Sequence, residues 1–545
     1  AGELDAGGTT LALEANGDFE SVEQIGEILT QVSSTGQLVR LKDLLTVRRG
    51  FVDPPDTPIY FNGQPALMLA VEMNDDRDIQ KIGRELKAHV AKFEQTQPIG
   101  ISYSFSTYQE TNVTASINGA LSNVAQTILV VLIVLMVFLG LRTALVVALI
   151  VPFTMAFALL GMSYLGVALE QISIAAVIIS LGLLVDNGLV VVEDIQNRLR
   201  AGTPPREAAL SAGRQFFVPL AVASITTVSA FIPMLILDGT TGEFAFSLGA
   251  VVAVMLLGSW ITAMYILPFI STHLLTAGKA PKENALVVGY GWLVRKLLRW
   301  GIIIVPVSYL IVVLGGSIFG QVKSEMFPLS ARADFLVYLD MPRGTSIKAT
   351  RDEALELEKW MSDKEVNPEI ASTTIFVGSG GPRFYLALSP ADTDPASAFI
   401  VVNTTDSDGA VAAAERLRKH VLLNHPAARF RVTRLSMGAG ESGIVEVKVS
   451  GEDGDKLLAA SKKLEAAFNT VPDQIFVKTD WGNKVVKMIV NIQQDKAREF
   501  GVTSKDISDV METFLSGTNE STYREGSDSI PIVLRADESF RDSLE

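Results

Sequence analysis

An acid and an amide stand side by side inside a long apolar stretch. They are Asp186 and Asn187, and the stretch runs from Ile172 to Val192. A helix over this stretch is about 31 Å long, enough to cross the hydrocarbon core of a bilayer. A charged side chain inside such a helix costs about 2.5–3.5 kcal/mol on insertion scales. Because a carboxyl group binds and releases protons, the chemistry that Asp186 could do is proton transfer within a membrane.

Proton transfer needs a change in the surroundings of the carboxyl group. Burial disfavours its charged form, whereas a nearby ammonium favours it. A helix that alternates between these two surroundings loads and releases a proton. The plainer alternative for Asp186 is a structural bond between helices, but acids in spans usually mark ion pathways. For Asn187 both roles stay open, since an amide can also bond across helices. Glu193 and Asp194 follow at the end of the span, where a solvated helix terminus is the plainer interpretation.

Composition restricts the class of protein. The chain has 545 residues, of which 19% are charged, and a mean hydropathy of +0.32, which indicates membrane spans combined with soluble domains. A net charge of −14 argues against a nucleic-acid partner. The chain has no cysteine, which excludes disulfides and thiol catalysis, and its four histidines lack metal-ligand spacing. We therefore expect no cofactor and no resident metal. The chain begins with Ala1, lacks a signal peptide and stops inside a predicted domain, so we expect a piece of a longer protein.

Six apolar segments are long enough to span a membrane. They are Ile117–Leu141, Thr143–Leu165, Ile172–Val192, Phe216–Leu237, Phe246–Ile270 and Gly301–Gly320.

Loop charges orient these segments. The loops after the first and third segments contain Arg and the loop after the fifth contains Lys and Arg, whereas Gly166–Gln171 and Asp238–Ala245 contain neither. The positive-inside rule places the basic loops in the cytoplasm. Because the number of spans is even, residues 1–116 and 321–545 share the other side. In a bacterium this is a multi-pass protein of the inner (plasma) membrane with both soluble regions in the periplasm.

Residues 331–437 alternate strand and helix patterns in the order β-α-β-β-α-β, which is typical of the ferredoxin-like fold. The expected strands are Phe335–Asp340, Ile370–Val377, Ala398–Asn403 and Arg429–Arg434, and the expected helices are Ser346–Met361 and Val411–Val421.

Similar patterns recur on both sides of this module. A second copy is expected from strands Ile444–Ser450, Gln474–Thr479 and Val485–Ile492 and helices Asp455–Asn469 and Ser504–Ser516. A β-α-β unit is expected from Ala66–Glu72, Ile79–Phe93 and Ile101–Ser106. Near the start, a helix at Ser21–Leu29 and strands at Gln37–Leu41 and Leu45–Val47 complete the expected elements.

Three glycines, Gly438, Gly440 and Gly443, match the spacing G-x-G-x-x-G. The dinucleotide fingerprint needs a strand before it and a helix after it. Since the segment after Gly443 again has a strand pattern, a flexible linker is the better interpretation.

Taken together, the motifs resemble the permeases of the resistance–nodulation–division (RND) superfamily. The run from Gly182 to Asp194 resembles their fourth helix. The resemblance extends over Val39–Asp43, Phe61–Ala66, Pro328, Met341–Gly344, Phe376–Pro382 and Ala497–Ile507, in order along the chain.

The resemblance implies a domain organisation. A full member has twelve spans, and this chain would hold six of them as an α-helical bundle, together with α+β periplasmic domains that include ferredoxin-like porter modules. The implied parts are the end of a docking subdomain (1–54), the second half of a porter module (55–112), the transmembrane bundle (113–325), two porter modules (326–437 and 438–518) and the start of a second docking subdomain (519–545).

The resemblance also implies a function. Such a permease is no enzyme but a proton antiporter of the multidrug type, which exports small amphiphilic compounds. It works as a homotrimer with a periplasmic adaptor protein and an outer-membrane channel. Asp186 matches the acid that carries the proton, and Asn187 stands where many members have a second Asp. The partner lysine belongs to a span outside this chain. Gly182 and Glu193 match residues that support the relay helix, and Gly438, Gly440 and Gly443 match a loop on the substrate path.

Other functions stay open. An RND lipid exporter, a metal-ion exporter or a non-exporting membrane sensor could use the same bundle. The dispersed methionines favour an organic substrate over Cu(I) or Ag(I), because adaptable packing is their commoner role. An intramembrane aspartyl protease would need a second acid that shares a proton with Asp186.

Overall fold

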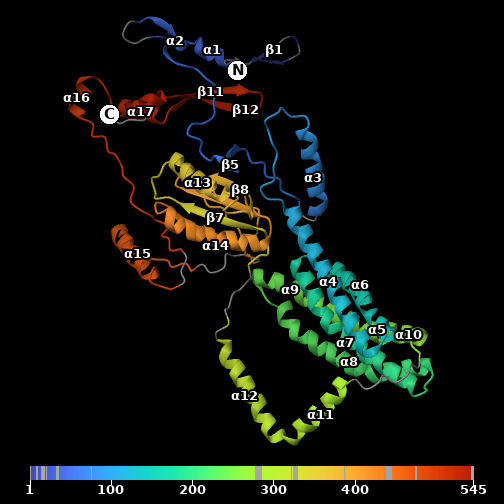
Figure 1. The fold of residues 1–545 in the computed structure, drawn as a ribbon. Coiled ribbons are helices and arrows are strands. Elements are labelled where there is room, and N and C mark those ends of the chain that lie inside the picture. The colour runs from blue at the N-terminus through green and yellow to red at the C-terminus, as the bar shows by residue number, and fades with distance from the viewer. Residues whose placement is uncertain are drawn as a thin grey trace. The chain divides into compact units, whose positions relative to one another are not determined.

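The computed structural model describes all residues except 1, 6, 8–9, 14–18, 20, 32–35, 75–76, 277–284, 321, 323–328, 386, 437, 439–444, 473–475 and 542–545. The chain forms two compact units (Figure 1). One consists of Ala1–Pro58, Pro342–Ala349 and Asp480–Glu545, and the other of Ile59–Met341 and Thr350–Thr479.

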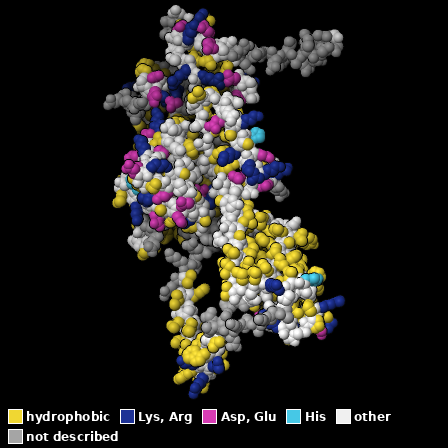
Figure 2. All heavy atoms as spheres, turned by 45° about the vertical axis from the view of Figure 1, so that its right-hand side comes forward, with side chains coloured by type: hydrophobic (Ala, Val, Ile, Leu, Met, Phe, Trp, Pro, Cys, Tyr) yellow, Lys and Arg dark blue, Asp and Glu magenta, His cyan; other side chains and the backbone are white. Residues whose placement is uncertain are grey.

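Within the described residues, 6 helical segments are long and apolar enough to cross a membrane. Each of the six predicted spans overlaps one of them, as a polytopic helical protein requires. The spans predicted to end at Leu141, Leu237 and Gly320 run one or two residues past the observed ends at Leu139, Leu235 and Phe319. The segments are α4 (Gln109–Leu139), α5 with α6 (Leu141–Ala148 and Ile150–Leu165), α7 (Gln171–Arg200), α8 (Pro205–Leu235), α9 with a π-helical turn and α10 (Gly239–Ile261, Thr262–Ile266 and Leu267–Leu274) and α12 (Gly301–Phe319). A further helix that was not predicted, α11 (Ala285–Arg299), precedes α12. In Figure 2, hydrophobic side chains cover these helices, while charged ones gather on the α+β part.

A proline accounts for the break between α9 and α10. Pro268 is the second residue of α10 and lacks the N–H that an α-helix requires. The π-helical turn Thr262–Ile266 lies directly before α10. Its wider hydrogen-bond spacing accommodates the bond that the proline cannot form.

The helices α4 to α10 share one apolar core, in which α7 takes a large part. The largest fully enclosed side chains of this core are Ile150, Leu181, Leu184, Ile195, Met255 and Leu267. By contrast, no residue of α12 is buried in the described structure.

A six-stranded sheet forms the centre of the α+β part, in the order β10-β7-β9-β8-β5-β6. All neighbouring strands are antiparallel. Its elements are β5 (Ile59–Phe61), β6 (Gln64–Ala66), β7 (Asp334–Asp340), α13 (Ile347–Ser362), β8 (Ile370–Val377), β9 (Ser397–Thr404), α14 (Ser407–Asn424) and β10 (Arg429–Arg434). The four strands from β7 to β10 and the two helices are those predicted for residues 331–437, in the split βαβ arrangement.

The hairpin β5–β6 was not predicted and extends this sheet. Asn62 and Gly63 form its turn with φ angles of 47° and 74°, as a type I′ turn requires. The Asn62 side chain accepts a hydrogen bond from the Thr373 N–H at 2.9 Å. A Cβ at Gly63 would lie 2.7 Å from Glu358 Oε2, so only glycine fits there without a shift. The turn thus fixes the hairpin against β8.

The β-α-β prediction for residues 66–106 was wrong for its strands. The helix is present as α3 (Ile79–Glu94). The described residues between Leu67 and Asn74, and the segment Ile101–Ser106, belong to no strand. The physical reason is that a strand exists only through pairing with a neighbour, and β5 has taken the free edge of β8.

The strands of the second predicted copy are also not formed. Residues 445–450, 476–479 and 485–492 belong to no strand, whereas Ile444 and residues 474–475 lie outside the described residues. The helices of this region are present as α15 (Gly454–Phe468), α16 (Gln494–Glu499) and α17 (Ser504–Leu515). Alternating apolar residues predict a strand-like backbone but do not provide the partner that completes a ladder.

The described residues of the first unit form three hairpins: β1–β2 (Gly2–Asp5 and Thr10–Leu13), β3–β4 (Leu29–Gln31 and Leu38–Arg40) and β11–β12 (Thr518–Glu525 and Asp528–Leu534). The predicted helix near residue 21 is α1 (Val22–Gly26). The strand predicted at Leu45–Val47 is absent, because the short helix α2 (Leu41–Leu44) turns the chain just before it.

The chain's first and last segments meet in ion pairs, including Arg49–Glu525 at 2.6 Å and Arg535–Asp53 at 3.1 Å. The domain boundaries from the sequence remain predictions.

Candidate proton site in α7

Helix α7 has a buried face and an exposed stripe. The stripe follows helical spacing along the whole helix and consists of Ala175, Ile179, Gly182, Leu183, Asp186, Val190, Glu193 and Asn197. Asp186 is the one charged residue of this stripe between its start and Glu193. The structure therefore brings Gly182, Asp186 and Glu193 onto one face, as their spacing of four and seven residues requires.

Asn187 has the opposite surroundings. It is buried at 8% exposure, and its amide donates to Ser224 Oγ of α8 at 3.3 Å and to Ser259 Oγ of α9 at 3.2 Å. The Ser259 hydroxyl in turn donates to the Leu184 carbonyl at 2.8 Å. Asn187 thus ties three helices together at the depth of Asp186.

Gly188 brings further helices close to the same point. A Cβ at this position would lie 2.9 Å from Ile150 Cδ1 and 2.9 Å from Leu267 Cδ1. Small residues allow such close approach between membrane helices. The backbone next to Asp186 and Asn187 is therefore held from the α6 and α10 sides as well.

Sequence reasoning missed Ser224, Ser259 and Gly188. The two serines are polar residues in apolar spans, but Thr226, Thr227 and Ser229 follow Ser224 and Thr262 follows Ser259, so the signal did not single them out. What the sequence could not supply is which faces of α8 and α9 meet α7.

The C-terminal end of α7 has its own polar contacts. Arg198 Nε donates to Asp194 Oδ2 at 2.6 Å, one turn earlier on the helix. Thr143 Oγ1 of α5 donates to the buried Gln196 Oε1 at 2.7 Å. Glu193 lies on the exposed stripe instead, apart from these contacts. These two hydrogen bonds thus hold the C-terminal end of α7 in place. The exposed stripe of α7 is not covered by the described helices.

The second predicted site, the glycine linker, is only partly described. Gly440 and Gly443 lie outside the described residues. Gly438 donates its N–H to Ser436 Oγ at 3.3 Å, and the Tyr385 hydroxyl donates to the Ser436 carbonyl. Burial raises the pKa of Tyr385, so its phenol stays protonated and available as a donor.

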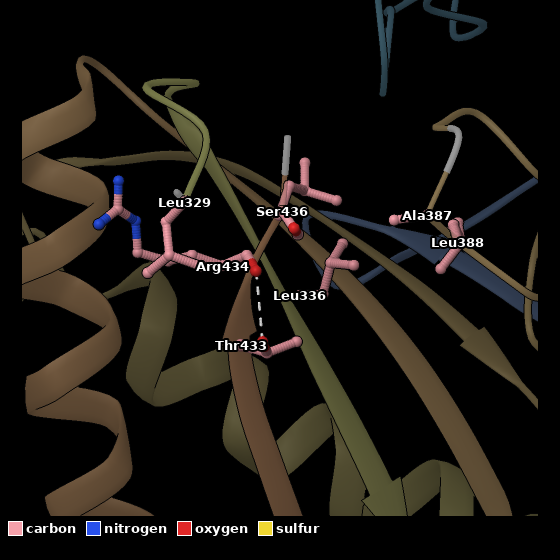
Figure 3. A pocket seen from close by; sticks show the side chains of 8 residues that line it. Leu329, Leu336, Ala387, Leu388, Thr433, Arg434 and Ser436 are labelled. Carbon is pink, nitrogen blue, oxygen red and sulfur yellow. Dashed lines mark hydrogen bonds between the residues drawn. The ribbon is translucent and has the colours of Figure 1, made fainter. Parts of the chain in front are cut away.

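A small cavity lies beside Ser436, two residues before Gly438 (Figure 3). It measures about 30 Å³ and is lined by Leu329, Leu336, Ala387, Leu388, Thr433, Arg434, Leu435 and Ser436. Since about 10–15 Å³ of such space suffices for one water molecule, the cavity has room for water, and it is small for an organic substrate. Within the described ranges there is also no group of three His, Cys, Asp or Glu residues placed to hold a metal ion.

The profile of the AcrB/AcrD/AcrF family matches residues 1–545. The chain belongs to this family. The RND resemblance inferred from the α7 motif is thereby confirmed.

The relatives of this AcrB/AcrD/AcrF chain include multidrug resistance proteins and metal resistance proteins. The multidrug resistance protein MdtC of Erwinia tasmaniensis is 22% identical over 93% of the chain and 50% of its own length. MdtC of Klebsiella pneumoniae is 23% identical over 93% of the chain and 49% of its length. The cobalt-zinc-cadmium resistance protein CzcA of Cupriavidus metallidurans is 23% identical over 100% of the chain and 53% of its length. The chain spans about half the length of these relatives.

Proposed function

We propose that the full-length protein is a proton-driven efflux permease of the inner membrane, with Asp186 as its proton carrier. Family membership and six membrane-capable helices support the general class. The observation that carries the coupling proposal is the position of Asp186 on the uncovered stripe of α7.

The stripe needs a protein cover. A carboxylate that faces lipid costs about 2.5–3.5 kcal/mol, whereas one that faces a bundle interior can pair and titrate. The relatives are about twice as long as this chain. We propose that further spans outside these 545 residues cover the stripe and bring a lysine ammonium opposite Asp186. Protonation of Asp186 would then weaken this pairing, and deprotonation would restore it.

In this proposal Asn187 is an anchor. An amide does not titrate between pH 5 and 8, so it cannot carry the proton by itself. Its bonds to Ser224 and Ser259 join α7 to α8 and α9. A change in the pairing of Asp186 therefore moves these helices as one body. Gly182 leaves room for close approach on the stripe, and Glu193 offers an acid nearer the helix end.

The soluble parts would move the substrate. We propose that the ferredoxin-like module around β7–β10 and the region 438–518 are porter modules in the periplasm, with the Gly438–Gly443 segment on the substrate path. The complete permease would be a homotrimer that docks a periplasmic adaptor protein and an outer-membrane channel. The multidrug names of two relatives support a small amphiphilic substrate.

Metal-ion export is the second candidate. The CzcA relative is as similar as the MdtC relatives and matches the whole chain. Transport of an amphiphilic dye and of Co²⁺, Zn²⁺ and Cd²⁺ by the same reconstituted protein separates the two. We expect the dye to be moved; cation transport without dye transport would favour the metal exporter.

The coupling proposal is tested with Asp186→Asn in the full-length protein, reconstituted in liposomes with an imposed pH gradient. We expect export to be lost and trimer assembly, measured by cross-linking, to be kept. Asp194→Asn is the matched control, because that acid lies on the same helix but already pairs with Arg198; it should keep export. If the Asp186→Asn variant still exports substrate in response to the pH gradient, the coupling proposal is wrong.

A further inference from the structure

Helix α4 is longer than a membrane span needs. Its 31 residues give a length of about 46 Å, whereas the hydrocarbon core of a bilayer is about 30 Å thick. The apolar stretch of α4 begins at Ile117, so Gln109 and the two turns that follow it extend beyond the span. No proline interrupts the helix, and a helix without such a break is expected to move as one rod.

Hydrogen bonds join the segment just before α4 to the six-stranded sheet. The hydroxyl oxygens of Ser106 and of Thr374 in β8 lie 2.6 Å apart. The Asn403 amide of β9 donates to the Ser106 carbonyl at 2.7 Å. These partners are 268 and 297 residues apart in the chain, so their proximity is a property of the fold and not of local connectivity.

A buried ion pair makes a third connection. Arg332 Nη2 donates to Asp334 Oδ2 at 2.6 Å, and Arg332 Nε lies 3.1 Å from both carboxylate oxygens. The two side chains are only 10% and 6% exposed. Arg332 Nη1 donates to Oε1 of Gln109, the first residue of α4, at 3.1 Å. We call these connections the sheet–α4 junction; it consists of Ser106, Gln109, Arg332, Asp334, Thr374 and Asn403.

The remaining length of α4 packs in the membrane bundle. Val124 and Leu135 of α4 are buried in the same apolar core as Leu184 and Val191 of α7. The candidate proton carrier, Asp186, lies between these two residues of α7. Helix α4 therefore shares a core with the helix of the proton site and is bonded at its start to the sheet.

We propose that Arg332 is a positioning residue, which keeps the start of α4 on the sheet through the whole transport cycle. Proton-driven movement of the bundle then reaches the sheet through α4. This inference rests on the proposed export function and adds which residues transmit the movement. The guanidinium is a planar fork that Asp334 holds from several directions, so the direction of its remaining bond to Gln109 is fixed as well.

A cross-link tests whether the junction stays closed, since these 545 residues contain no cysteine. Any cysteine outside this chain is replaced by serine in the full-length protein. Ser106→Cys and Thr374→Cys then place two sulfurs where the hydroxyl oxygens lie 2.6 Å apart, close to the about 2.05 Å of a disulfide. The protein is reconstituted in liposomes with an imposed pH gradient, either oxidised or reduced. Export of ethidium is measured, or of Zn²⁺ if the unsubstituted protein moves the cation instead.

We expect the oxidised and the reduced protein to export at equal rates. Export that stops on oxidation and returns on reduction would show that the junction has to open, and would overturn the proposal. The unsubstituted protein separates the two proposals. If it exports while the cross-linked protein does not, the inference about the junction alone is wrong. If it exports neither compound, the export function on which the inference rests is wrong as well.

Loss of the ion pair tests Arg332 itself. Removing one partner would leave the other charge buried and unpaired, so Arg332→Gln and Asp334→Asn are combined. We expect proton flux, followed with a pH-sensitive dye inside the vesicles, to be kept while export is lost, so that more protons pass for each exported molecule. Adding the oxidised pair Ser106→Cys and Thr374→Cys to this variant should restore export.

The matched control is Arg416→Gln with Glu369→Gln. This pair lies in the same ferredoxin-like module, with 2.6 Å between Arg416 Nη2 and Glu369 Oε2, and the other hydrogen bond of Arg416 goes to Asn367 and not to α4. The control should keep the ratio of protons to exported molecules. If export and proton flux fall together in the Arg332 variant, or if the cross-link does not restore export, Arg332 has a purely structural role and the proposal is wrong.

Discussion

Two adjacent side chains of α7, Asp186 and Asn187, face opposite ways. The sequence placed both at one depth but left their roles open, because a helix turns by about 100° per residue and only the packing shows which side is covered. Asn187 proved to be the buried partner of two serines. Asp186 points to the side that the described helices leave open.

Removing the Asn187 amide should cost stability without changing proton chemistry. Asn187→Ala leaves Ser224 and Ser259 without their donor, and we expect a loss of about 1 kcal/mol in the free energy of unfolding. Denaturation in mixed detergent micelles measures it. Because Ser259 shares the bond, Asn187→Ala and Ser259→Ala should be non-additive; additive losses would contradict the shared contact.

A histidine pair in the ferredoxin-like module gives a pH-dependent prediction. The His420 ring stacks on Trp360 with centroids 3.9 Å apart, and His425 Nδ1 donates to the Glu353 carboxylate at 2.7 Å. Burial and the neighbouring His425 lower the pKa of His420. The folded module therefore binds this proton less readily than the unfolded chain, so its stability is full above about pH 6.5 and declines as the pH falls below that value toward the lowered pKa.

The measurement is thermal unfolding between pH 7.5 and 5.5, followed by the Trp360 emission as the difference between the protein and its Trp360→Phe variant. His420→Phe keeps a ring on Trp360 but removes the titrating group, so its curve should be flatter. Equal slopes for both proteins would rule out His420 as the cause.

At the scale of elements, close helix contacts depend on particular glycines. A Cβ at Gly161 of α6 would lie 2.4 Å from Val254 Cγ1, and one at Gly258 of α9 would lie 2.8 Å from Phe157 Cβ. Gly161→Ala should therefore push α6 and α9 apart and destabilise the bundle by about 1–3 kcal/mol. Gly182→Ala is the matched control, since a Cβ there has nothing within 4 Å. Equal losses in both variants, measured by thermal unfolding in detergent, would contradict the close contact.

The elements also show how far sequence patterns reach. The spans and α13–α15 were predictable, because apolar length and 3.6-residue spacing are local properties of the chain. Strands β7 to β10 were predictable because helices separate the hydrophobic runs and fix their order. Val485–Ile492 has an equally strong strand pattern but forms no ladder, whereas the unpredicted β5 pairs with β8. Whether a segment forms a strand depends on a pairing partner that is distant in sequence. A local sequence pattern cannot identify that partner.

At the scale of the whole molecule, the open stripe of α7 makes a functional prediction. These 545 residues alone, reconstituted in liposomes, should carry no proton flux under an imposed pH gradient, because nothing covers Asp186. A pH-sensitive dye inside the vesicles measures the flux, with Asp186→Asn as the baseline. Flux above that baseline would mean that the six spans suffice.

The open stripe also has a consequence for biogenesis. Covering one acid that costs about 2.5–3.5 kcal/mol in lipid favours the assembled bundle by up to about 70- to 400-fold. In the proposed permease, whose further spans cover the stripe, a newly inserted chain displays this carboxyl group to lipid until the cover arrives. Exposure of Asp186 to lipid would then distinguish an unassembled chain from an assembled one.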